Sequence, residues 1–438
     1  MSTRIDWTSS PSGPLGGEVV IPGDKSVSHR AVMFAALAEG TSTISGFLEG
    51  EDTRATARAF AQMGVRIETP SASQRVVHGV GLHGLAGSAA PIDCGNAGTG
   101  MRLLAGLLAG QAFDSVLVGD ESLSRRPMRR VIEPLVEMGA RIEAGDGGLP
   151  PLHVRGGRRL RGIRCKPPVA SAQVKSAILL AGLYAEGETV VEEVHPTRDY
   201  SERMLAAFGW PVAFGEGWAR LSGGHRLHAG EVVVPADFSS AAFFLVAASL
   251  VPGSVLTLRD VGLNPRRTGL LDVLRRMGAD IRQQNRRQQG GEVLADLVVR
   301  HAPLHGIDVP VDRVPDMIDE FPALFIAAAA AGGTTRVRGA AELRVKESDR
   351  IATMAAGLRA LGVDIAETAD GAEIRGGTIR GGRVASFGDH RIAMSFAVAG
   401  LVADGPVRID DCANVATSFP HFDACANACG FRLEERAG

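Results

Sequence analysis

The sequence is poor in aromatic residues and has no excess of charge of either sign. Aromatic side chains make up 5% of its 438 residues, too few for a stacking platform that binds single-stranded nucleic acid. The 47 lysines and arginines nearly balance the 49 aspartates and glutamates, which leaves a net charge of −2. Bulk charge therefore does not hold this chain to nucleic acid or to an anionic membrane, and we expect neither as a partner.

Cysteine is scarce, and long hydrophobic runs are missing. The five cysteines are odd in number and form no Cys-x-x-Cys pair, so no disulfide framework is expected. The longest uncharged stretch, 238–258, is interrupted by Pro252 and Gly253, which a membrane-spanning helix of about 20 residues disfavours. The polar segment 1–9 lacks the apolar core of a secretory signal. We predict a cytoplasmic, reduced protein without a membrane anchor.

Lysine is the rarest charged residue. Only Lys25, Lys166, Lys175 and Lys346 occur, so arginine supplies 43 of the 47 basic side chains. Because an ammonium is compact and can titrate, unlike a guanidinium, each lysine is a candidate for a specific role. The alternative is four leftover lysines in an arginine-rich chain.

A pattern that recurs six times dominates the rest of the sequence. Each copy has an amphipathic helix that ends in glycine, where a left-handed C-cap costs least, followed by a β-like run. A second helix precedes it, with a polar start and an otherwise apolar sequence, which predicts burial. The amphipathic segments are 55–68, 131–143, 201–214, 269–283, 351–367 and 421–434, and the buried segments are 26–40, 98–110, 171–187, 239–253, 319–333 and 389–405.

Six copies predict two similar α/β domains of three units each. Two nearly identical strand–proline segments, 17–23 and 230–236, mark where the chain passes from one domain to the other. We predict a discontinuous domain made of 1–22 plus 238–438 and an inserted domain made of 23–237. A cleft between two such domains is the expected place for a ligand site.

Polar residues gather at the starts of the helices predicted to be buried. A helix N-terminus offers free N–H groups and a favourable dipole to anions. Capping by Ser or Asn, and solvated arginines, are the alternatives. Asp316 and Glu347 add acid–base groups, although Asp316 with Asp319 could also cap a helix. Together these residues predict a site for two small anions, a phosphate and a carboxylate. The helix starts are 23–30, 94–102 and 171–175, and the further cations are Arg125, Arg126, Arg198, Lys346, Arg350 and Arg391.

No nucleotide or metal motif stands out. A Walker A sequence and a dinucleotide fingerprint are both missing, so no nucleotide is implied. His421, Cys425 and Cys429 are spaced like ligands on one helical face, but free cysteine is also common in protein cores. We expect neither a metal nor a cofactor.

Several of these motifs resemble 5-enolpyruvylshikimate-3-phosphate (EPSP) synthases, from about residue 17 to the C-terminus. The resemblance implies two domains of three βαβαββ units around a pseudo-threefold axis, with the active site in the interdomain cleft. It also implies transfer of the enolpyruvyl group of phosphoenolpyruvate to the 5-hydroxyl of shikimate 3-phosphate by addition–elimination, with release of phosphate. We also expect a monomer. The motifs are 22–30, 95–102, 126–127, 171–173, 344–350 and 389–391, and 119–127 and 416–420 resemble the class II branch.

The resemblance assigns roles to individual residues. Asp316 would take the proton of the 5-hydroxyl, Glu347 would protonate the methylene carbon, and Lys25 would stabilise the tetrahedral intermediate. The residues for shikimate 3-phosphate would be Lys25, Ser26, Arg30, Ser171, Ala172, Gln173, Arg198, Asp316 and Lys346, and those for phosphoenolpyruvate Lys25, Gly98, Arg126, Gln173, Arg350 and Arg391.

Two positions differ from those of many relatives. Thr417 stands where many have a lysine that contacts phosphoenolpyruvate, as in class II members. Gly98 stands where glyphosate-tolerant class II enzymes have alanine, so we expect inhibition by glyphosate.

The sequence disfavours three alternative functions. The related UDP-N-acetylglucosamine enolpyruvyl transferase has a loop cysteine that 121–126 lacks. An RNA-end cyclase is disfavoured by the neutral charge. A non-catalytic binding protein for phosphorylated metabolites would gain nothing from carboxylates beside its ligands.

Overall fold

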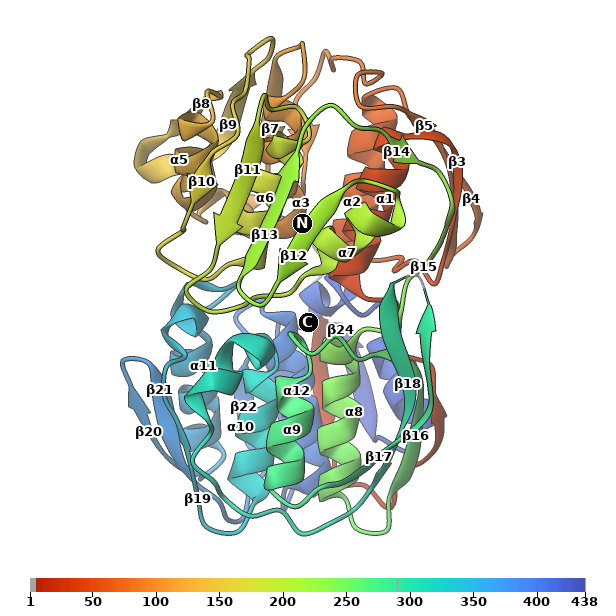
Figure 1. Ribbon diagram of the computed structural model, residues 1–438. Helices are drawn as coiled ribbons and strands as arrows, with labels where there is room; N and C mark the ends of the chain where they lie inside the picture. Colours follow the sequence, from red (N-terminus) through yellow and green to blue (C-terminus); the bar gives the residue numbers. More distant parts are fainter. Residues whose placement is uncertain (1–4, 290, 438) are drawn as a thin grey trace. The chain divides into compact units, whose positions relative to one another are not determined.

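The chain divides into two compact units in the computed structural model, which describes residues 5–289 and 291–437 (Figure 1). Unit 1 comprises Met1–Pro22, Ala236–Gln288 and Val293–Gly438, and unit 2 comprises Gly23–Pro235 and Gln289–Glu292. The second passage between units therefore lies two residues before the predicted one, and the short segment 289–292, which no sequence signal marked, belongs with unit 2. Each unit has its own apolar core.

The six predicted buried helices are confirmed. They share a polar start and a body whose side chains are buried on nearly all sides, as their apolar composition requires. In unit 1, α8, α10 and α12 each contact the other two and lie side by side (Figure 1). In unit 2, α3 contacts both α1 and α6. The bounds are α1 Lys25–Leu37, α3 Gly98–Ala109, α6 Ala172–Gly182, α8 Phe238–Leu250, α10 Phe321–Ala330 and α12 His390–Val402.

The six glycine-ended helices are confirmed as well. Every predicted terminal glycine has a positive φ, from 78° at Gly362 to 109° at Gly430, which is the left-handed conformation of a C-cap. The helices are α2 Glu51–Gln62, α5 Arg129–Glu137, α7 Tyr200–Ala207, α9 Gly269–Arg276, α11 Arg350–Ala360 and α13 Phe422–Ala428, and a short α4 covers Glu121–Ser124.

Three sheets form the outer layer of unit 2. In each, the strand after a buried helix pairs with the second strand of a hairpin, whose first strand follows an amphipathic helix. The first sheet contains β3 (Ala38–Ser45), β4 (Arg66–Ser71), β5 (Gln74–Val80), β14 (Leu227–His228) and β15 (Glu231–Val233); the second contains β6 (Ile92–Asp93), β7 (Ser115–Val118), β8 (Arg141–Gly145) and β9 (Leu149–Arg155); the third contains β10 (Arg164–Cys165), β11 (Glu188–Glu192), β12 (Val212–Gly215) and β13 (Trp218–Ser222).

Two sheets of unit 1 repeat this order in full, and the third repeats it with β1 in place of the hairpin's second strand, in agreement with the predicted βαβαββ unit. The first contains β2 (Gly16–Val19), β16 (Val255–Gly262), β17 (Asp280–Gln289) and β18 (Glu292–Arg300); the second contains β19 (Thr334–Val337), β20 (Asp364–Thr368) and β21 (Gly371–Arg375); the third contains β22 (Gly382–Ala385), β23 (Val407–Asp410), β24 (Leu433–Ala437) and β1 (Ile5–Ser9).

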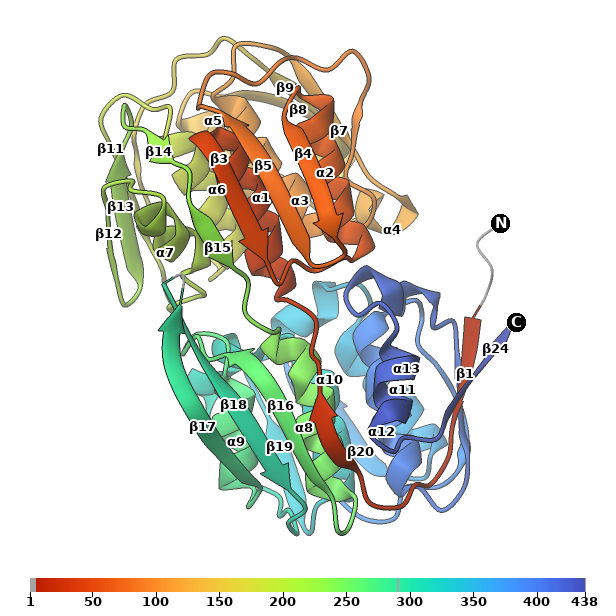
Figure 2. The same ribbon diagram turned by 90° about the vertical axis from the view of Figure 1, so that its right-hand side faces the viewer.

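The N-terminal strand completes the last sheet. β1 pairs antiparallel with both β23 and β24, so it takes the place that the hairpin's second strand has in the other sheets (Figure 2). The two ends of unit 1 are thereby joined by hydrogen bonds between strands far apart in sequence. No helix in the described part of the chain has the length and apolarity needed to cross a membrane.

Candidate active site

The starts of α3 and α6 meet at Gln173. Its side-chain oxygen accepts a hydrogen bond from Arg102 at 2.7 Å, and its amide nitrogen donates to Thr99 Oγ1 at 2.8 Å. Ser171 is the N-cap of α6 and accepts from the backbone N–H of Val174. The predicted residues of 95–102 and 171–173 therefore lie together, although they are about 70 positions apart in sequence.

Arg126 lies beside Gly98, at the start of α3. Its guanidinium donates to Asn96 Oδ1 at 2.6 Å and to Ser122 Oγ at 3.1 Å. A Cβ atom on Gly98 would lie 3.0 Å from Arg102 Nη1 and 3.1 Å from Arg126 Nη1. The missing side chain at Gly98 thus leaves room in which two guanidinium groups face a helix N-terminus, an arrangement suited to an anion.

Lys25 is the first residue of α1 and pairs with a carboxylate from the next helix. Its Nζ lies 3.0 Å from Asp52 Oδ2, and its side chain is 16% exposed. Asp24, the N-cap, accepts from the N–H of Val27 and from the hydroxyl of Tyr200. The lysine is therefore held at the helix start but still reaches solvent.

Arg30 is more deeply buried than its predicted role suggests. Its guanidinium donates to Ser201 at 2.7 Å, to Ser176 at 2.8 Å and to the carbonyl of Ser26 at 2.9 Å. Burial, and then the positive charge of Arg198, lowers the pKa of Arg30 to about 10. The positive charges of Arg30 and Arg198 repel each other, and an anion bound between them would stabilise both. Ala172, the first residue of α6, is buried.

Lys175 points into the protein and not toward an open helix start. Its Nζ lies 2.8 Å from Glu193 and 2.8 Å from Glu202, and all three side chains are at most 4% exposed. Burial alone would lower the pKa of Lys175, but the two carboxylates outweigh it and raise the pKa. The rarity of lysine thus marked a structural ion triad at this position.

Arg350 is the best-anchored cation of unit 1. Its Nε donates to Asp389 at 2.8 Å, and one terminal nitrogen donates to Glu347 at 2.6 Å. Its other terminal nitrogen lies 3.5 Å from Asp319, and the side chain is 1% exposed. The pKa of Arg350 is raised, because the three carboxylates outweigh its burial. Arg350 joins the starts of α10, α11 and α12.

Arg391 contrasts with Arg350. It is 6% exposed, yet its guanidinium makes no hydrogen bond or ion pair to any residue in 5–289 and 291–437. The nearby carboxyl of Glu320 is buried, and burial raises the pKa of Glu320. One oxygen of Glu320 has no hydrogen-bond partner, and the other accepts from Ser239.

Asp316 lies in a short 3-10 helix, η2 (Val311–Met317), and is 3% exposed. Guanidinium nitrogens of Arg266 and Arg313 lie 3.7 and 3.9 Å from its Oδ2. The N-cap of α10 is Glu320, which makes no side-chain cap hydrogen bond.

Lys346, on the chain between the 3-10 helix η3 (Ala341–Val345) and α11, lies 3.0 Å from Glu342. Thr417, in the last 3-10 helix, η4 (Ala413–Thr417), donates to the carbonyl of Asn414.

Comparison with known proteins gives a single result. The family described as EPSP synthase (3-phosphoshikimate 1-carboxyvinyltransferase) matches residues 9–424. The chain belongs to the EPSP synthase family. The 3-phosphoshikimate 1-carboxyvinyltransferase of Xanthomonas campestris pv. campestris strain B100 is 67% identical over 430 residues, 98% of each chain. That of Xanthomonas euvesicatoria pv. vesicatoria strain 85-10 is 68% identical over 433 residues, 99% of this chain and 98% of the relative.

Solved EPSP synthase structures have the same fold. The EPSP synthase from Acinetobacter baumannii superposes with a TM-score of 0.90 at 51% identity, covering 99% of this chain and 100% of that one. A second structure of the enzyme from this organism gives a TM-score of 0.88 at 50% identity. The family, the fold and the classification as a transferase of the shikimate pathway inferred from the motifs are confirmed.

Several charged residues beside the assigned site residues belong to no motif in the sequence. Asp52, Arg266 and Arg313 sit in ordinary charged segments, and only the fold brings them beside Lys25 and Asp316. Asp389 was part of a motif, but its role as the shared acceptor for Arg350 and Ser348 comes from the structure.

The proposed metal alternative at the C-terminus has no geometric support. His421 is the N-cap of α13 and Cys429 its C-cap, and both Cys425 and Cys429 contact backbone carbonyls. Within the described residues, no group of three His, Cys, Asp or Glu side chains is placed to hold a metal ion.

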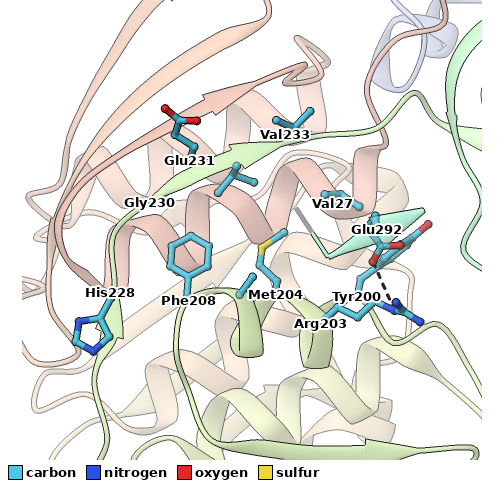
Figure 3. Close-up of a pocket in the computed structure, with 12 residues that line it drawn as sticks. Val27, Tyr200, Arg203, Met204, Phe208, His228, Gly230, Glu231, Val233 and Glu292 are labelled. Carbon is cyan, nitrogen blue, oxygen red and sulfur yellow. Dashed lines mark ion pairs between the residues drawn. The ribbon is translucent and has the colours of Figure 1, made fainter. Parts of the chain in front are cut away.

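Unit 2 contains a pocket. It is lined mainly by apolar side chains of α1, α7 and β15, including Val27, Met204 and Phe208 (Figure 3). Arg203 and Glu292 form an ion pair at 3.7 Å at one end. None of the residues assigned to either substrate is among its lining residues.

Proposed function

We propose that this chain transfers the enolpyruvyl group of phosphoenolpyruvate to the 5-hydroxyl of shikimate 3-phosphate, forming 5-enolpyruvylshikimate 3-phosphate and phosphate. Membership of the EPSP synthase family supports the reaction. The residues assigned by the motifs supply the acid, the base and the cations that such a reaction needs.

The observation that carries the proposal is the state of Arg391. Arg391 is 6% exposed as a whole residue, and its guanidinium has no hydrogen bond or ion pair among the described residues, so its donors are open to a ligand. Arg350, one helix away, is held rigidly by Asp389 and Glu347. A bound phosphate or carboxylate would supply the charge that Arg391 lacks, which suits a phosphorylated carboxylic acid such as phosphoenolpyruvate.

The chemistry follows in two steps. In the addition, Asp316 takes the proton from the 5-hydroxyl, the oxygen bonds to C2 of phosphoenolpyruvate, and Glu347 gives a proton to the methylene carbon. In the elimination, the Glu347 carboxylate takes a proton back from that methyl group, the C2–O bond to phosphate breaks, phosphate leaves, and the double bond reforms. Lys25 stabilises the negative charge of the tetrahedral intermediate.

The assigned residues divide between the two units. Lys25, Gly98, Arg126 and Gln173 belong to unit 2, whereas the acid–base pair and the remaining cations for phosphoenolpyruvate belong to unit 1. That both sets act together in a cleft, that the chain is a monomer, and that it works in the cytoplasm stay predictions.

A single assay tests the reaction. Phosphate release from phosphoenolpyruvate is measured with and without shikimate 3-phosphate, with no added metal, and the product mass is checked. Release that depends on shikimate 3-phosphate, with the enolpyruvyl ether formed, supports the proposal. Binding of shikimate 3-phosphate without release would favour the non-catalytic binding protein instead.

Variants then test the residue roles. Arg391→Gln should lower kcat/KM by about 30-fold or more, since loss of a buried charge partner costs roughly 2–5 kcal/mol. Arg282→Gln is the matched control, because Arg282 lies on β17 and is 65% exposed. A loss below tenfold at Arg391, or an equal loss in the control, removes Arg391 from the site.

Proton delivery has a separate readout. In deuterated water, turnover should place deuterium on the methylene carbon, and Glu347→Gln should abolish this exchange. Asp316→Asn should lower kcat while the binding of shikimate 3-phosphate is largely kept. If the Glu347 variant still incorporates deuterium at the wild-type rate, another residue must protonate the methylene carbon.

A further inference from the structure

Phe387 combines two unfavourable features in one residue. Five described non-glycine residues have a positive φ: Asp260, Asn285, Phe387, Asp411 and His421. Asp, Asn and His tolerate this conformation, whereas a bulky apolar residue there is a genuine outlier. The side chain of Phe387 is also 66% exposed.

The surrounding structure holds this turn in place. Phe387 and Gly388 have successive positive φ values of 53° and 68°, and the N–H of Asp389 donates to the carbonyl of Ser386 at 3.1 Å. This is the pattern of a type I′ turn, which prefers Asn or Asp at the position that Phe387 occupies. Asn414 donates to the carbonyl of Gly388 at 2.6 Å.

The turn leads into the start of α12, where Arg350 and Arg391 lie on either side of Asp389 in the hydrogen-bond pattern. Asp389 is the N-cap of α12, accepts from Arg350, and also accepts from the N–H of Arg391. The exposed Phe387 therefore stands two residues before the N-cap of the helix that carries Arg391, whose guanidinium has no ion-pair partner in the described chain. Strain that neighbouring contacts maintain is typical of positions under functional constraint.

We propose that the ring of Phe387 packs against phosphoenolpyruvate when Arg391 binds it, and so acts as a specificity-determining residue. This rests on the proposed function. The substrate has one apolar part, its methylene group, and cations alone do not recognise it. An aromatic wall buries that group and excludes water, which strengthens the contact between Arg391 and the anion.

Three variants separate the ring from the turn. Phe387→Asn removes the ring and relieves the strain, so Tm should rise by about 2–4 °C while the KM for phosphoenolpyruvate rises roughly fivefold. Phe387→Ala removes the ring but keeps the strain, so KM should rise equally without a gain in Tm. Phe387→Tyr should resemble the wild type in both measurements.

The readouts distinguish this inference from the proposed function. The KM for shikimate 3-phosphate should change less than twofold in all three variants, and Val136→Ala, which trims an exposed apolar side chain on α5, should change neither KM. Wild-type KM for phosphoenolpyruvate in both the Asn and the Ala variant would overturn the role of the ring. If the wild type releases no phosphate, the proposed function fails, and the Tm shift produced by phosphoenolpyruvate in the same variants then tests the contact.

Discussion

We expect His29 to make this protein sensitive to mild acid. It is 1% exposed, on the first buried helix, and its Nδ1 lies 2.7 Å from Thr56 Oγ1. Its other ring nitrogen is buried without a hydrogen-bond partner. Burial first, and then the positive charges of Lys25 and Arg30, lowers the pKa of His29 to about 3.

The size and sign of the effect follow from proton linkage. Unfolding returns His29 to a pKa of about 6.5, so the unfolded chain binds a proton that the folded chain excludes. The folded state therefore loses stability as pH falls below about 6.5. At pH 5 the loss is about 2 kcal/mol, since each pKa unit corresponds to about 1.4 kcal/mol and the gap spans about 1.5 units.

The test compares the wild type with His29→Gln, whose amide can still bond Thr56. Urea unfolding is measured for both proteins at pH 7 and at pH 5. Every other titrating group is common to the two, so the wild type should lose about 2 kcal/mol more than the variant between the two pH values. Equal losses would refute the reasoning, because they would mean that His29 titrates in the folded protein much as it does in the unfolded chain.

Three further predictions concern Gly98, Lys175 and Glu320. Gly98→Ala should raise the KM for phosphoenolpyruvate and weaken glyphosate inhibition still more, because the new methyl group crowds Arg126; competition curves with both ligands check this, and a wild-type enzyme uninhibited at millimolar glyphosate would sink it. Lys175→Met should cost roughly 3–5 kcal/mol in denaturant unfolding, since it leaves two buried carboxylates without a cation; a change below about 1 kcal/mol argues against the triad. Burial raises the pKa of Glu320, so its neutral form stabilises the fold below about pH 4.5 and this contribution is lost as pH rises through the folded pKa. The stability of Glu320→Gln relative to the wild type should therefore increase from pH 5 to pH 8, and an equal Tm difference at the two pH values would mean that Glu320 is ionised at little cost.

Local signals account for most of what could be predicted from the sequence. The glycines that end the amphipathic helices, such as Gly64 and Gly430, mark a conformation that depends on one residue and its immediate neighbours. The apolar composition of α8 and α10 predicts burial in the same local way. Because these features recur in step, the sequence alone determined six repeats, an α/β fold and, through its motifs, the EPSP synthase family.

Pairings between distant segments were decided only by the tertiary structure. No local pattern indicates that β1 completes the sheet of β23 and β24, because strand pairing depends on which edges the fold leaves open. The motifs identified Lys175, Arg350 and Arg391 as similar cations, yet the first is enclosed by two carboxylates, the second is anchored by three, and the third has no ion-pair partner among the described residues. The sequence determines the charge of a side chain. Whether that charge is neutralised depends on which oppositely charged groups the folded chain places within about 4 Å of it.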